Sequence, residues 1–188
     1  MKLWLLRHAQ VDLPAGLCYG ASDVPAHAAL TLQAAQAAAK LLPVGLPVWV
    51  SALGRAQALA QALQQLRPDL GPPSTDPRLN EMNFGCWELQ PWDAVPRSAF
   101  DVWMADFAHH RFGGAESTQQ VIDRVAQALQ SLRAAQVPEA VWVTHAGVIR
   151  AVQFVATQGA GPLPVAIGSV DQWPTDAPAP GGHLCIDW

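Results

Sequence analysis

Short apolar runs alternate with segments of helical period along most of this 188-residue chain. Three of the runs, at 3–6, 47–51 and 140–144, are nearly continuous, which is typical of buried strands in a parallel sheet. Each is followed, directly or after a loop, by a stretch whose apolar residues recur at helical spacing. The alternation predicts an α/β fold, a three-layer sandwich with a mostly parallel central sheet and helices on both faces.

The remaining elements follow from the same periodicity and from turn residues. Helices are expected at 32–42, 56–66, 117–135 and 146–157, with further strands at 74–75 and 184–187. Thr31 is the expected cap of the first helix. Residues 78–115 lack a regular period and are dense in Trp, Phe, Pro and Gly. We therefore expect a single domain over 1–188, with an irregular lid or insertion at about 86–115.

The composition excludes several classes of protein. Hydrophobic residues make up 51% and charged residues 14%, against about 25% charged residues in typical globular chains. This balance is the opposite of that in disordered proteins. The net charge is −4, with 11 Lys and Arg, so there is no basic excess to neutralise a nucleic-acid backbone. Neither disorder nor a nucleic-acid partner is expected.

The cysteines and the amino-terminal residues bear on the compartment. Cys18, Cys86 and Cys185 are far apart, so we expect buried reduced thiols rather than a disulfide framework or zinc site. The first apolar run is interrupted at Arg7, well short of the 7–15 apolar residues that are typical of a secretory signal. No stretch approaches the roughly 18 apolar residues of a membrane span. A cytoplasmic protein with no membrane partner is expected.

Scarce arginine and histidine residues stand just beyond the expected strands. Arg7 and His8 follow the first strand, Arg55 opens the helix after the second, and His145 opens the helix after the fourth. Ligands of open α/β sheets bind beyond the carboxyl ends of the strands. Arginine offers a fork of donors that matches phosphate oxygens, and helix N-termini present free N–H groups to anions. The pattern predicts a phosphate or carboxylate site with a histidine as base, acid or nucleophile.

These residues also lie in recognisable motifs. Arg7-His8 resembles the RHG signature of the histidine phosphatase superfamily, the phosphoglycerate-mutase-like proteins. Segments similar to further family motifs follow in order at 16–23, 30–37, 51–56 (S-x-L-x-R-A), 78–88 (L-x-E-x-x-F-G-x-W-E), 114–117 (GGES) and 143–150 (V-T-H-x-G-x-I-R). The compact length and the Gly-Leu-x-Tyr-Gly and Trp-Glu…Trp-Asp elements are most similar to the alpha-ribazole phosphatase branch.

The resemblance implies a phosphomonoester hydrolase that works without a metal or other cofactor on a small phosphorylated metabolite. Alpha-ribazole phosphate is the candidate that it suggests, with small sugar or glycerate phosphates as alternatives. His8 would attack phosphorus and become a phosphohistidine. Arg7, Arg55 and His145 would bind the phosphoryl oxygens. Glu81 would protonate the leaving alcohol and then activate water.

The proposed chemistry places demands on two protonation states. His8 must be unprotonated to attack, and repulsion from the two neighbouring arginines is expected to lower its pKa. Glu81 must carry a proton when it acts, which exclusion of water by an apolar wall would favour. Trp87 and Trp92 lie in the same segment and are candidates for that wall, or for core residues.

For several residues the sequence leaves two interpretations open. Tyr19 and Gly20 are either phosphate contacts or turn residues. Arg150 is expected to brace its helix rather than contact substrate. Adjacent histidines on a helix cannot face one site, so His109 and His110 are expected to be solvated or lid residues. The oligomeric state is also left open.

The chain departs from the family pattern close to the signature histidine. Ala9 stands where the family has glycine, Val11 where it has threonine, and Pro14 where it has asparagine. Loss of hydrogen-bond donors at the latter two positions predicts a phosphate pocket with weaker support, and slower turnover. Two alternatives therefore stay in view: phosphoryl transfer of the phosphoglycerate mutase type, and a phosphate-binding protein without turnover.

Overall fold

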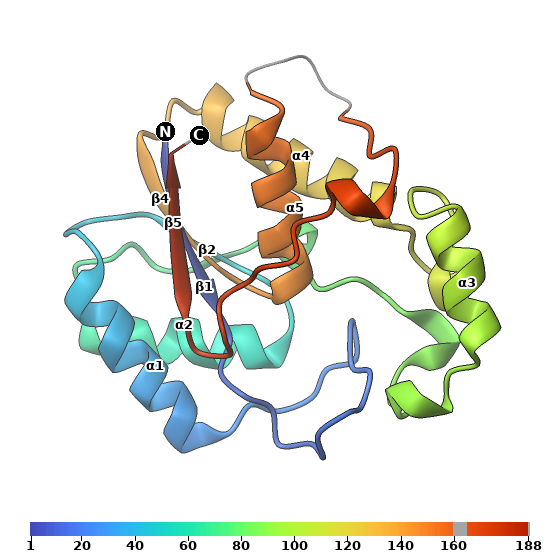
Figure 1. The fold of residues 1–188 in the computed structure, drawn as a ribbon. Helices are drawn as coiled ribbons and strands as arrows, with labels where there is room; N and C mark the ends of the chain where they lie inside the picture. Colours follow the sequence, from blue (N-terminus) through green and yellow to red (C-terminus); the bar gives the residue numbers. More distant parts are fainter. Residues whose placement is uncertain (160–164, 188) are drawn as a thin grey trace.

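A five-stranded sheet forms the centre of the computed structural model, which describes residues 1–159 and 165–187. The strands are β1 (Lys2–Arg7), β2 (Val48–Val50), β3 (Ser74–Thr75), β4 (Glu139–Thr144) and β5 (His183–Asp187). They lie in the order β3-β2-β4-β1-β5. All neighbours are parallel except β5, which runs antiparallel to β1 at one edge (Figure 1).

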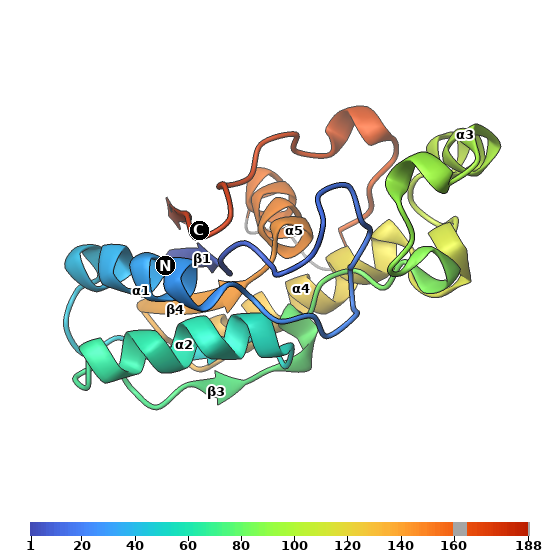
Figure 2. The ribbon, with the colours of Figure 1, turned by 90° about the horizontal axis from the view of Figure 1, so that it is seen from below.

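Helices cover both faces of this sheet, which confirms the predicted fold. They are α1 (Ala28–Leu41) and α2 (Gly54–Leu66) on one face, and α4 (Thr118–Ala134) and α5 (Ala146–Thr157) on the other (Figure 2). Successive side chains of a strand point to opposite faces. In β4, Trp142 packs into the core with α4 and α5, whereas Val141 and Val143 pack into the core with α1 and α2. Burial on both sides explains why the strand is apolar throughout.

The carboxyl ends of three parallel strands meet at one edge of the sheet. The His8 N–H donates to the Thr144 carbonyl at 3.0 Å, and the Ser51 N–H donates to the Val143 carbonyl at 3.0 Å. His145 follows directly as the N-cap of α5. Three residues from distant parts of the sequence are therefore brought together by strand pairing alone.

The chain between β3 and α4 consists of short helices. They are η1 (Pro77–Leu79), η2 (Gly85–Trp87), η3 (Trp92–Ala94), α3 (Arg97–Ala105) and η4 (Phe112–Gly114). Figures 1 and 2 show α3 standing beside the sheet rather than on either face. Aromatic rings hold this part together, with Trp103 and Phe112 stacked at a centroid distance of 4.5 Å. A further short helix, η5 (Val170–Gln172), precedes β5.

Most of the predicted elements are confirmed. The helix at 146–157 has the predicted bounds, and Ser117 caps α4 in a capping box with Gln120. The prediction that Thr31 caps the first helix is wrong. That helix begins at Ala28, and the Thr31 hydroxyl donates to the His27 carbonyl within its first turn. A threonine there mimics a cap in sequence because its hydroxyl can bond to the backbone of the preceding turn.

The cysteines only partly match the expectation. All three are free, and burial raises the pKa of the Cys18 thiol to about 12. Cys185 is half-buried and Cys86 is exposed, so the expectation of buried thiols is wrong for Cys86. In the part of the chain that the structure describes, no helix combines the length and apolar character needed to cross a membrane. The single domain over 1–188 stays a prediction, because 160–164 and 188 lie outside the described residues.

Candidate active site

His8 is buried directly after β1, with 2% of its surface exposed. Its Nδ1 atom lies 2.7 Å from the Ala9 carbonyl oxygen, which can only accept a hydrogen bond. Nδ1 therefore carries the ring proton, and Nε2 keeps its lone pair. Burial, followed by the charge of Arg55 and then that of Arg7, lowers the pKa of His8 to about 3. The lowered pKa was predicted, but burial is its main cause rather than arginine repulsion.

His145 is fully buried beside His8, and the centroids of the two rings are 5.0 Å apart. Its Nε2 atom lies 2.8 Å from the Ser51 hydroxyl oxygen. That hydroxyl donates its proton to Asn80 Oδ1 at 2.8 Å, so it must accept from His145 Nε2–H. The remaining Nδ1 atom is buried and has no partner among the described residues. Burial, and next the charge of Arg55, places the pKa of His145 well below its usual value.

The two arginines predicted to bind phosphate lie in different surroundings. Arg7 lines the cavity beside His8, and its Nη1 atom donates to the Pro178 carbonyl at 2.8 Å. Arg55 is fully buried, does not line that cavity, and donates to the carbonyls of Gly20 and Ser22. The Nε atoms of both arginines are buried without a partner in the described part of the chain. Arg55 thus fixes the loop at 20–22 and contributes positive charge close to His8.

Glu81 reaches the same cavity from the segment after η1. Its Oε1 atom accepts from the Met82 N–H and its Oε2 atom accepts from the Gly147 N–H, both at 3.0 Å. The second contact ties the carboxyl group to the first turn of α5, next to His145. A side chain at position 147 would collide with Glu81 Oε1, so glycine is what permits this approach.

Tyr19 and Gly20 both line the cavity. The Arg55 guanidinium lies over the Tyr19 ring at 5.3 Å, and this ring is edge-on to His8 at 6.4 Å. The Gly20 carbonyl accepts from Arg55, and a side chain at position 20 would collide with the Met82 carbonyl. Gly20 is therefore required by close packing, whereas Tyr19 belongs to the wall of the cavity.

The cavity has a volume of about 340 Å³, and its lining combines two kinds of residue. Arg7, His8 and Glu81 supply titratable groups. The aromatic lining residues are Phe84, Trp92, Trp103, Phe107 and Trp173. Trp92 lines the cavity, which agrees with its interpretation as part of an apolar wall rather than of the core. Trp87 is not among the lining residues and instead packs against Phe112, at a centroid distance of 6.0 Å.

Arg150 is a cavity residue that the sequence interpretation undervalued. It lines the cavity from α5, and its Nη2 atom donates to the Thr175 carbonyl at 3.1 Å. Its place in the lining would allow a contact with substrate, so the expectation that it braces its helix rather than contacts substrate stays a prediction. Gly147 and Arg150 are three residues apart, which places them on one face of the helix, and this spacing could have revealed it. His109 and His110 are not among the lining residues.

Two of the three departures from the family pattern lie in a different depression from this cavity, and the third contacts His8. Val11 and Pro14 line a separate surface depression, and Val11 pairs with Ala26 in an isolated bridge. Neither residue is among those that line the cavity of His8, and the slower turnover expected from these two positions stays a prediction. Ala9 is fully buried, and its carbonyl is the partner of His8 Nδ1. The described residues include no group of three or more His, Cys, Asp or Glu side chains placed to hold a metal ion.

The geometry is that of an α/β protein with paired histidines and arginines at the carboxyl edge of its sheet. The sequence description of the histidine phosphatase superfamily (branch 1) matches residues 3–162. This match spans most of the chain, and the protein therefore belongs to the histidine phosphatase superfamily, as the motifs predicted. A comparison with curated proteins gives no match.

Solved structures agree with this assignment. A phosphoglycerate mutase from Thermus thermophilus is 28% identical with a TM-score of 0.72, and the match covers 100% of this chain and 94% of that chain. A mycobacterial glucosyl-3-phosphoglycerate phosphatase is 26% identical with a TM-score of 0.70, covering 84% and 79%. A protein described as mycobacterial hydrolase 2 is 25% identical with a TM-score of 0.74, covering 98% and 80%.

Proposed function

We propose that the protein is a phosphomonoesterase that works through a phosphohistidine on His8 and needs no metal ion. The observation that carries the proposal is the contact between His8 Nδ1 and the Ala9 carbonyl at 2.7 Å. It leaves the lone pair on Nε2 of a ring that burial keeps neutral, beside a cavity. A neutral imidazole with a free lone pair is the form that can attack phosphorus.

In the first step, His8 Nε2 forms a bond to phosphorus while the bond from phosphorus to the ester oxygen breaks. Glu81 gives its proton to that oxygen, and the alcohol leaves. In the second step, water attacks phosphorus, Glu81 takes a proton from the water, and the bond from phosphorus to nitrogen breaks. The net reaction converts a phosphate ester and water into an alcohol and phosphate.

Charge stabilisation would come from the protein's own cations. Phosphoryl transfer depends on positioning and on donors aimed at the equatorial oxygens. Arg55 and His145 are not among the lining residues, and the charge of Arg55 acts on the site through His8. Arg7 and Arg150 line the cavity, and the Nε atoms of both are buried without a partner in the described residues. Buried polar atoms are normally hydrogen-bonded, so these orphaned atoms support a bound anion. His145 would have to take up a proton at Nδ1 to donate to that anion.

The aromatic residues of the cavity support a substrate whose alcohol part carries a flat, largely apolar ring. Phe84, Trp92 and Trp103 are among the lining residues and would give such a ring apolar contact. Alpha-ribazole phosphate, with its benzimidazole ring, satisfies this requirement and is the substrate we propose. Kinetic comparison with 3-phosphoglycerate tests the choice: a higher kcat/KM for the glycerate would contradict it. The proposal also includes a cytoplasmic location, with neither nucleic acid nor membrane as partner.

The experiment that tests the proposed function is hydrolysis of p-nitrophenyl phosphate in excess EDTA, by wild type and by His8→Gln. Turnover in the wild type that falls by about a thousandfold or more in the variant is expected. A strict requirement for a divalent metal would contradict the proposal. Because one relative is described as a phosphoglycerate mutase, the products from 3-phosphoglycerate should also be identified. Isomerised rather than hydrolysed product would favour phosphoryl transfer.

A further inference from the structure

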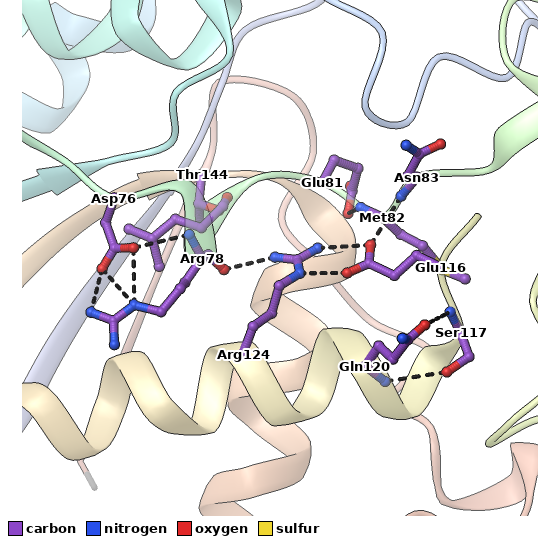
Figure 3. Close-up of polar contacts among 11 residues, drawn as sticks. Asp76, Arg78, Glu81, Met82, Asn83, Glu116, Ser117, Gln120, Arg124 and Thr144 are labelled. Carbon is purple, nitrogen blue, oxygen red and sulfur yellow. Dashed lines mark hydrogen bonds and ion pairs between the residues drawn. The ribbon is translucent and has the colours of Figure 1, made fainter.

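Glu81 lies in the middle of a segment that is held at one end by Arg124 of α4 and at the other by Glu116, which precedes α4. At one end, Arg124 Nη1 donates to the Arg78 carbonyl at 2.7 Å. At the other end, Glu116 Oε2 accepts from the Asn83 N–H at 3.0 Å, and the Glu116 N–H donates to the Asn83 carbonyl at 3.2 Å. Figure 3 shows the contacts made by the Arg124 and Glu116 side chains on either side of Glu81.

The side chains of Arg124 and Glu116 also form an ion pair with each other. Arg124 Nε and Nη2 lie 2.7 and 3.2 Å from Glu116 Oε1 and Oε2, which is the two-pronged geometry of an arginine fork on a carboxylate. Each side chain is only 18% exposed. The contacts therefore close a ring that runs from the Arg78 carbonyl through Arg124 and Glu116 to Asn83, and the segment carrying Glu81 completes it.

The carboxyl group of Glu81 has little else to fix it. Among the described residues, its hydrogen bonds outside its own segment reduce to the one from the Gly147 N–H at 3.0 Å, since its other oxygen accepts from the adjacent Met82 N–H. A general acid must lie within hydrogen-bond reach of the oxygen that it protonates, and small displacements are costly. The position of the backbone on both sides of Glu81 is thus what sets its reach into the cavity.

We propose that Glu116 and Arg124 are positioning residues for proton transfer by Glu81, a role that rests on the proposed function. The ring of contacts holds residues 78–83 against α4 and keeps the Glu81 carboxyl group over the ester oxygen. Neither side chain touches substrate. Loss of these contacts therefore lowers the rate only for substrates whose leaving group needs a proton. Such a selective loss is what displacement of a general acid produces.

The experiment compares two substrates that share a benzene ring and differ in the leaving oxygen. p-Nitrophenolate leaves readily without a proton, whereas the alkoxide of benzyl phosphate needs one. The kcat/KM values of both are measured for wild type, Glu81→Gln and Glu116→Gln. In Glu116→Gln one acceptor oxygen becomes an NH₂ group, which faces a donor of Arg124 or of Asn83. Glu81→Gln gives the full size of the effect when the acid is absent.

We expect Glu116→Gln to lower kcat/KM for benzyl phosphate by about tenfold or more, within the 10²- to 10⁴-fold ceiling of acid catalysis. The value for p-nitrophenyl phosphate is expected to stay within about threefold of wild type. Arg124→Lys, which keeps the charge but loses the fork, should show the same selective loss and serves if Glu116→Gln folds poorly. Equal losses on both substrates in either folded variant would overturn the proposal.

A matched control is available at the other end of the molecule. The Asp69 carboxylate also accepts two hydrogen bonds from one arginine, Arg67, and one from a backbone N–H, that of Gly45. Asp69→Asn therefore removes the same kind of contact far from Glu81 and should leave the substrate ratio unchanged. If wild type hydrolyses neither substrate, the proposed function fails. If wild type is active but Glu81→Gln lowers kcat/KM by the same factor on both substrates, the acid role fails, and the positioning role fails with it.

Discussion

The imidazole rings of His8 and His145 lie with their centroids 5.0 Å apart, tilted by 55° to each other. Both rings are buried, and burial lowers both pKa values. Two like charges at this distance in a site that also contains Arg55 would repel strongly, so both rings stay neutral in the unliganded protein. The arrangement leaves a lone pair on His8 Nε2 and another on His145 Nδ1, which the proposed mechanism requires.

The lowered pKa of His8 makes stability depend on pH. Between pH 6.5 and about 3 the unfolded chain binds a proton at this position and the folded protein does not. The free energy of unfolding therefore falls as the pH falls through this window. His8→Gln removes one such proton, so its slope should be shallower by about 1.4 kcal/mol per pH unit. Urea titrations of both proteins between pH 6 and 4 measure the slopes, and parallel slopes would show that the folded-state pKa of His8 is not lowered.

Ser51→Ala should reduce both stability and activity. The substitution removes the acceptor of His145 Nε2–H and leaves a buried donor unsatisfied, at a cost of about 1–3 kcal/mol. It also frees the ring to take the other tautomer, and we expect kcat/KM to fall by about tenfold, equivalent to about 1.4 kcal/mol. Urea denaturation and steady-state kinetics check the two effects. Unchanged kinetics in the folded variant would show that the hydrogen bond between His145 and Ser51 does not affect turnover.

Gly147→Ala should lower activity without lowering the free energy of unfolding. The added methyl group would collide with Glu81 Oε1, the far end of a flexible side chain, while alanine suits a helix better than glycine by about 0.5–1 kcal/mol. We expect a stable fold, with benzyl phosphate hydrolysis lowered by about tenfold or more.

Gly20→Ala is the contrasting substitution, because the methyl group there would meet the Met82 carbonyl, which is backbone. It should lower the free energy of unfolding by about 1–3 kcal/mol. The reverse pattern, an unstable Gly147→Ala and a stable Gly20→Ala, would contradict the packing described here.

Pro14→Asn should leave the enzyme unchanged. Pro14 is exposed and lines a depression separate from the cavity of His8. Surface substitutions of this kind change free energies by about 0.5 kcal/mol or less, so kcat/KM should stay within about twofold of wild type. A marked rise in kcat/KM would show that the loop contributes to the phosphate site after all.

The layers of the fold and the strand-end residues could be predicted from the sequence, because each follows from a local pattern. The apolar run at 140–144 and the helical period after it define β4 and α5, and His145 stands between them. Strand pairing then brings His8 beside His145 without further information.

The features that escaped prediction depend on contacts between distant residues. The Arg124–Glu116 pair contacts a segment about forty residues earlier in the chain. No sequence spacing predicts a contact of this kind. The pKa of His8 is set mainly by burial, which is a property of the packed protein rather than of its neighbours in sequence. The place of Val11 and Pro14 likewise depends on the path of an irregular loop, which motif alignment cannot supply.

The most direct test of the central claim is detection of the covalent intermediate. Wild type and His8→Gln would be mixed with a labelled phosphomonoester in EDTA, quenched in alkali within the first turnover, and digested for mass spectrometry. The account predicts one phosphoryl group on the peptide containing His8, in wild type only, at a level that decays as product forms. Turnover by the wild type with no phosphorylated peptide, or with the label on another residue, would contradict it.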